Sequence, residues 1–151
     1  MPDIVKELPR ILLESSEAYI RACGAVPPPQ LHILLEDRGV PYVGYMVCRR
    51  FYRGADAATA TANLGVLPSV LKATRIMAVW EDSDMRTAFE LPGGPFAMGI
   101  SILDARLNGQ HTLHWNPFSA VLGAPSRWRK REVVINWGPS SRYENVQLLA
   151  P

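Results

Sequence analysis

Residues 31–51 read LHILLEDRGVPYVGYMVCRRF, two apolar runs separated by a short polar turn. The first run covers 31–35, and the second covers 42–51 and is apolar on both faces until its arginines. Between the runs lie Gly39 and Pro41, residue types that favour turns. Because this connection is too short for a crossover to a parallel strand, the two runs predict an antiparallel β-hairpin.

Helical segments and further strands extend outward from this hairpin. Apolar residues recur at helical spacing over 9–23, and Gly24 is a natural end for that helix. Asp56 is the predicted N-cap of a second helix, and the acidic run 81–84 the predicted cap of a helix over 85–90. The second predicted helix covers 57–64, and a further short helix covers 69–74. The other predicted strands cover 75–80, 96–103, 111–115 and 132–137.

This order of elements predicts an α/β or α+β fold. A mixed β-sheet of five or six strands would carry helices packed on one or both faces. The chain has 151 residues, which favours one domain. We assign residues 1–140 to a single globular domain and residues 141–151 to a loosely held C-terminal tail.

The composition limits the classes of function and of compartment. The net charge is only +2, so a generic polycation for nucleic acid is excluded. The 13 arginines against 3 lysines, with 16 alanines, are typical of a GC-rich bacterial or phage genome. With neither a signal peptide nor an apolar run long enough for a membrane span, we expect a soluble cytoplasmic protein. Cys23 and Cys48 are then expected to be reduced, small buried hydrophobes.

Acidic residues follow three of the predicted strands. They are Glu36, Asp82, Asp84 and Asp104. Gathered at one end of a sheet, such carboxylates could hold Mg²⁺ or Mn²⁺ and support hydrolysis of a phosphate ester or nucleic acid. The competing interpretation of Asp82 and Asp84 is capping of the helix that follows them. His32, inside an apolar run, is expected to be a hydrogen-bonded histidine of the core or sheet face.

Two clusters combine basic side chains with aromatic rings, a composition found both at protein interfaces and at nucleic-acid sites. The candidate binding residues are Arg49, Arg50 and Arg53 in the first cluster and Arg127, Trp128, Arg129, Lys130 and Arg131 in the second. A solvated loop is the alternative interpretation of the second cluster.

The sequence contains neither a G-x-S-x-G nucleophile elbow nor a phosphate-binding loop. We therefore expect a non-catalytic protein-interaction or regulatory module that needs no cofactor and binds another protein or a second copy of itself. The alternatives are the metal-dependent hydrolase, using Mg²⁺ or Mn²⁺, and a nucleic-acid-binding accessory factor.

Overall fold

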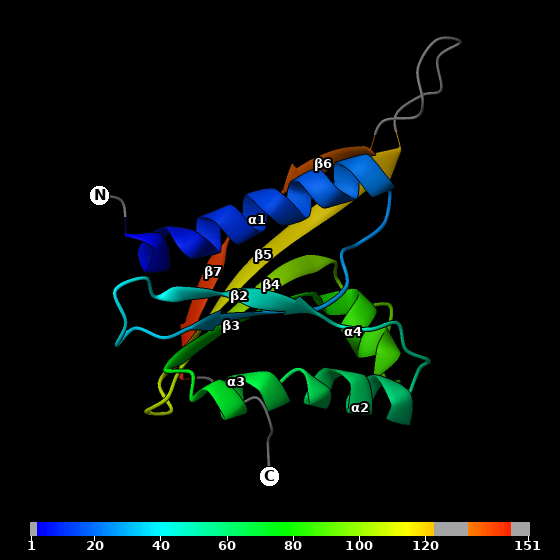
Figure 1. Cartoon of the computed structure of the whole chain (residues 1–151). Helices are drawn as coiled ribbons and strands as arrows, with labels where there is room; N and C mark the ends of the chain where they lie inside the picture. The colour runs from blue at the N-terminus through cyan, green and yellow to red at the C-terminus, as the bar shows by residue number, and fades with distance from the viewer. Residues whose placement is uncertain (1–2, 123–132, 146–151) are drawn as a thin grey trace.

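The structure, a computed structural model, describes residues 3–122 and 133–145. Within these ranges, seven strands form a sheet in which every pairing is antiparallel (Figure 1). The order is β2-β1-β3-β4-β5-β6, and β7 pairs with β5. The strands are β1 (Gln30–Leu34), β2 (Tyr42–Val47), β3 (Arg75–Glu81), β4 (Gly99–Arg106), β5 (His111–Leu122), β6 (Val133–Trp137) and β7 (Ser141–Glu144).

The predicted single-domain fold of sheet and helices is confirmed as a mixed α+β fold, and so is the hairpin of β1 and β2. The sheet has one strand more than predicted and no parallel pairing among its described strands. The additional strand is β7, which lies inside the segment 141–151 that the sequence assigns to a loose tail. The described part of that tail is therefore held by the β5 ladder.

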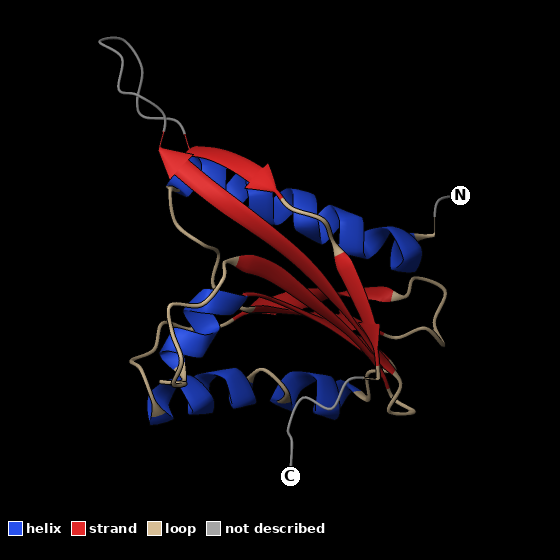
Figure 2. Cartoon of the chain, turned by 180° about the vertical axis from the view of Figure 1, so that it is seen from behind, coloured by secondary structure: helices blue, strands red, loops and turns tan. Residues whose placement is uncertain are grey.

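The helices lie on opposite sides of the sheet. They are α1 (Ile4–Cys23), α2 (Ala55–Asn63), α3 (Val66–Leu71) and α4 (Asp82–Ala88). Figures 1 and 2 show α1 on one face of the sheet and α2 and α3 on the other. No helix in the described ranges is both long and apolar enough to cross a membrane.

The main core lies between α1 and the centre of the sheet. Leu8, Leu12 and Ile20 recur along one side of α1 and are almost fully buried. They pack against residues of β1, β3, β4, β5 and β6 that point toward this helix. We call this side of the sheet the α1 face. The cluster includes Leu34, Met77, Val79, Ile100, Ile102, Phe118 and Ile135.

Each of the four described helices begins a few residues earlier than predicted. The helix α1 starts at Ile4, because the Asp3 side chain accepts a hydrogen bond from the Val5 amide at 3.0 Å, and Pro9 lies inside the helix. The helix α2 starts after Gly54, which caps it without a side-chain hydrogen bond. The predicted cap Asp56 lies in the first turn instead, where it accepts from the Tyr52 amide at 2.8 Å.

The strands β6 and β7 lie end to end along one edge of the long strand β5 (Figure 2). Three residues separate them, whereas only two residues separate their partners on β5, so the ladder contains a bulge at this point. The Gly138 amide donates to the Pro117 carbonyl at 2.8 Å, and the Ser140 hydroxyl donates to Asn116 Oδ1 at 2.9 Å. These bonds join the two halves of the ladder.

One close approach inside the sheet gives the first prediction. A β-carbon at Gly99 would overlap the indole ring of Trp115 on the neighbouring strand. We expect Gly99→Ala to lower the free energy of unfolding by about 2 kcal/mol, the usual cost of overpacking. In the background Trp115→Leu, the same change should cost less than half as much. Urea unfolding of the four proteins measures this coupling, and additive losses would contradict it.

Candidate functional site

The four predicted metal-ligating carboxylates lie in two separate places. Glu36 and Asp104 are both within ion-pair distance of Arg75, at 3.5 and 2.5 Å. Asp82 and Asp84 follow the other end of β3, about 20 Å away along the strand. In the part of the chain that the structure describes, no three His, Cys, Asp or Glu side chains gather in a metal-binding group. The predicted set therefore does not form one ion site.

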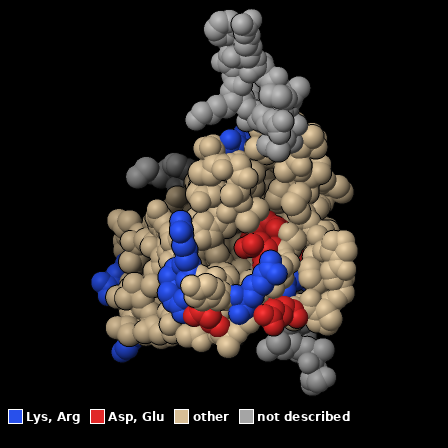
Figure 3. Space-filling model, turned by 90° about the vertical axis from the view of Figure 1, so that its right-hand side faces the viewer, with Lys and Arg blue, Asp and Glu red and all other residues tan. Residues whose placement is uncertain are grey.

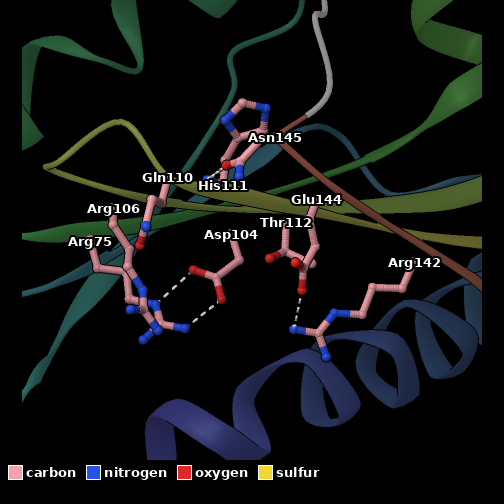
Figure 4. Close-up of a pocket in the computed structure, with 9 residues that line it drawn as sticks. All are labelled: Arg75, Asp104, Arg106, Gln110, His111, Thr112, Arg142, Glu144 and Asn145. Atoms are coloured by element: carbon pink, nitrogen blue, oxygen red, sulfur yellow. Dashed lines mark hydrogen bonds and ion pairs between the residues drawn. The ribbon is translucent and has the colours of Figure 1, made fainter.

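Asp104 lines a small polar pocket of about 220 Å³ at one end of β3 and β4, and Glu36 lines a neighbouring hollow that shares Arg106 with it. In Figure 4 the Arg75 and Arg106 side chains extend side by side, and Asp104 projects toward Arg75. Arg75 donates to both oxygens of Asp104, at 2.7 and 2.5 Å. The hydrogen bonds from Arg75 to Asp104 raise the pKa of the guanidinium further above its ordinary value. Arg75 is largely buried and already paired with Asp104, so the main role of this ion pair is to hold β3 and β4 together.

In the first basic cluster, one arginine forms an ion pair within the chain, and the other two do not. Arg49 forms a two-pronged pair with Asp56, at 2.8 and 3.2 Å, and this pair lowers the pKa of that carboxyl. Arg50 and Arg53 are exposed, and Tyr52 between them is 85% exposed. On the face in Figure 3, basic side chains lie next to acidic ones rather than forming one continuous basic patch. The second cluster, 127–131, lies outside the described residues.

His32 is a buried, fully hydrogen-bonded residue, as the sequence predicted. Its Nδ1 lies 2.9 Å from the Tyr42 hydroxyl, and its Nε2 lies 3.1 Å from Gln30 Oε1. Since Gln30 Oε1 can only accept, Nε2 carries the proton and Nδ1 accepts from Tyr42. The ring also stacks on Tyr45, with the ring centres 5.2 Å apart. Burial lowers the pKa of His32 to about 4 and raises the pKa of Tyr42.

The strand β2 forms one edge of the sheet and pairs only with β1 among the described strands. Its side chains alternate, and Val43, Tyr45 and Val47 are each about half exposed. Tyr45 stacks on His32 and Val47 follows it two residues later in the regular part of the strand, so these two side chains lie toward the α1 face. A free strand edge beside exposed apolar side chains is a surface that another strand can cover.

A large hollow lies between the sheet and α2, on the face opposite α1. This apolar cleft has a volume of about 930 Å³. Its walls include Leu31, Ile76, Ala78 and Trp80 from the strands, with Leu64 from the end of α2. Met85, Phe89 and Leu91 close one side, where Arg86 and Asp82 provide polar groups. A second hollow of about 640 Å³ shares Gly65 and Ile76 with the cleft and continues beside α3.

Sequence reasoning missed both of these surfaces. It interpreted β2 as buried on both faces, because its run of apolar letters shows no alternation. Trp80, the next-to-last residue of β3, also lines the cleft. The cysteine prediction is half right, since Cys48 is buried but Cys23 is exposed at the end of α1. Burial raises the pKa of the Cys48 thiol, although Arg49 acts in the opposite direction.

The lowered pKa of His32 makes stability depend on pH. The unfolded chain binds this proton near pH 6.5 and the folded chain only near pH 4, so acidification favours unfolding. The wild type should lose roughly 3 kcal/mol through this group as the pH falls from 7 to 4. The variant His32→Gln lacks this loss, and His114 titrates in both proteins. Urea unfolding across this pH range should show a steeper decline for the wild type, and parallel curves would contradict the assignment.

No protein-family model, no curated protein and no solved structure matches this chain. Function is therefore inferred from the residues and the geometry of this chain.

Proposed function

We propose that the protein is a non-catalytic protein-interaction module that binds through the free edge of β2. The occupant that its chemistry fits best is β2 of a second copy, paired antiparallel about a two-fold axis. The proposal rests above all on the exposed edge, whose unpaired backbone N–H and C=O groups can continue the hydrogen-bond ladder. The pairing would extend the sheet across two molecules and remove one edge from each.

The side chains of this edge support the proposal. From Tyr42 to Cys48 the chain has no charged residue and no proline, the two kinds of residue that usually protect an edge strand. A register shift opposite Ile33 and Leu34 leaves 44–47 as the regular part of the strand. Val47 and Tyr45 project from this part and are exposed, so a covering strand would remove apolar area from water.

Charges beyond the two ends of β2 favour a second copy as the occupant. Asp37 lies in the turn before β2, and Arg50 follows the strand at its other end. Both are exposed, and neither forms an ion pair with another described residue. An antiparallel pair of identical strands places the start of one beside the end of the other. Each interface would therefore bring Asp37 and Arg50 of different copies together twice.

The alternatives have less support. The hydrolase requires four converging carboxylates, but these lie in two places, and two of them already contact Arg75. Nucleic-acid binding is favoured by a continuous basic patch, but Arg49 is paired with Asp56, and basic side chains lie next to acidic ones on the face in Figure 3. The interaction module requires none of these features, and it uses Arg50 in its exposed position.

Blocking the edge should abolish self-association. Val47→Lys places a charged side chain on the exposed row of β2, a position where charge usually prevents edge-to-edge pairing. We expect a dimer for the wild type and a monomer for this variant at micromolar concentration by sedimentation equilibrium. The matched control is Val134→Lys on β6, the other outer strand, with 47% exposure at that position. A monomeric wild type, or a dimer lost only in the control, would refute the proposal.

Exchanging the end charges tests the antiparallel geometry separately. Arg50→Glu replaces two attractive contacts by two repulsive ones, so we expect the dimer to weaken by about fivefold. Adding Asp37→Arg in the same chain recreates both attractive contacts and should restore the affinity. The sedimentation measurement at low salt reports both effects. A double variant that dimerises no better than Arg50→Glu would show that these residues do not meet.

A further inference from the structure

We propose that the apolar cleft between α2 and the sheet binds an elongated apolar small molecule with an anionic head group, and that Arg86 holds the head. This site is separate from the β2 edge, because it faces the opposite side of the sheet. It would add a ligand-binding activity to the proposed interaction module.

The first support is the incomplete contact between two layers. The helix α4 contacts β3 and β4 directly, whereas α2 and α3 make no comparably close contact with any described strand. The space between α2 and the sheet is the cleft of about 930 Å³, within the range of small-molecule sites in proteins. Water in such a space meets mostly carbon, so an apolar ligand that displaces the water would bind favourably.

The second support is that apolar and charged side chains line different parts of the cleft. Ile76, Ala78 and Leu31 supply an aliphatic floor from the strands, and Leu64 faces the same space from the helical layer. The described lining residues that carry charge are Asp82 and Arg86, and both belong to α4. A ligand that fits this arrangement has a long apolar body and a single charged end.

The third support is the state of Arg86. Its Nε donates to Asp82 Oδ2 at 2.7 Å, and its guanidinium lies over the ring of Phe96 at 5.5 Å. Its two terminal nitrogens make no hydrogen bond to any described residue, and half of the side chain is exposed. They can therefore donate to a carboxylate, sulfonate or phosphate at the mouth of the cleft. Asp82 lies next to Arg86, so its negative charge would weaken the binding of an anionic head group.

The test uses the whole protein and three probes that differ only in the head group. Decanoate, 1-decanol and decylammonium are titrated separately by calorimetry, each below its micellar concentration. We expect saturable one-to-one binding of decanoate, weaker binding of decanol and the weakest binding of decylammonium. Equal affinities would overturn the role of Arg86, and the absence of saturable binding for all three would overturn the site itself.

Two variants at the head should change affinity in opposite directions. Arg86→Gln should weaken decanoate binding by about fivefold, the value of a half-exposed ion pair, and leave decanol unchanged. Asp82→Asn should tighten decanoate binding, because it removes the competing negative charge. General damage to α4 would weaken both probes in both variants. That outcome would contradict the proposed contact.

A variant in the body of the cleft tests its location. Ala62 on α2 lines the cleft and is exposed, so Ala62→Trp fills the space without disturbing a packed core. It should weaken decanoate binding about tenfold. Asn63→Trp, on the next residue of the helix, points about 100° away and should bind as the wild type does. Thermal unfolding confirms that both variants are folded, and equal loss in both would place the ligand elsewhere.

Discussion

A buried carboxylate at the end of β3 fixes the relation between the central strands and α4. Glu81 is 2% exposed, and its oxygens accept from the backbone amides of Ser83, Asp84 and Gly99 at 2.9–3.0 Å and from the Ser83 hydroxyl. A carboxylate this deeply buried is stable only with such a full set of donors. Because the donors belong to α4 and β4, one side chain sets where the helix starts and how the chain returns to the sheet. Glu81 therefore also fixes the position of the charged end of the apolar cleft, since Asp82 and Arg86 lie on α4.

Local signals in the sequence predicted the elements whose causes are local. The turn after β1 and the acidic run 81–84 have specific chemistry within a few residues. The predicted hairpin is observed, and Glu81 of the acidic run caps α4, whereas Asp82 and Asp84 lie in the first turn of the helix. The second half of β5 could not be predicted in this way, because Pro117 interrupts the pattern and usually argues against an inner strand. Here the proline lies at the ladder bulge, where its carbonyl accepts from Gly138 and no donor is required from its nitrogen. That solution depends on Gly138, 21 residues further along the chain, which no local pattern reveals.

The candidate metal site failed for a reason of topology. The sequence grouped acids because each follows a strand, which would gather them in a parallel sheet, where all strands end on one side. In this antiparallel sheet β1 and β4 run in one direction and β3 runs in the other. Glu36 and Asp104 therefore meet at one end, together with Arg75 from the start of β3, whereas Asp82 and Asp84 lie at the other end. Predicting the buried pair of Arg75 and Asp104 would have required the order of the strands in the sheet, which the spacing of residues in the sequence does not give.

The two proposed binding surfaces lie on opposite faces of the same hairpin. In β1, His32 faces the side of α1 and supports Tyr45 of the exposed row, while Leu31 faces the cleft. Adjacent residues of a strand point to opposite faces, so the two surfaces share a backbone but no side-chain contact between these residues. A partner at the β2 edge would order the hairpin through its hydrogen-bond ladder, and one wall of the cleft belongs to that hairpin. Coupling between dimer and ligand would therefore pass through the backbone of β1, and by thermodynamic linkage it would act equally in both directions.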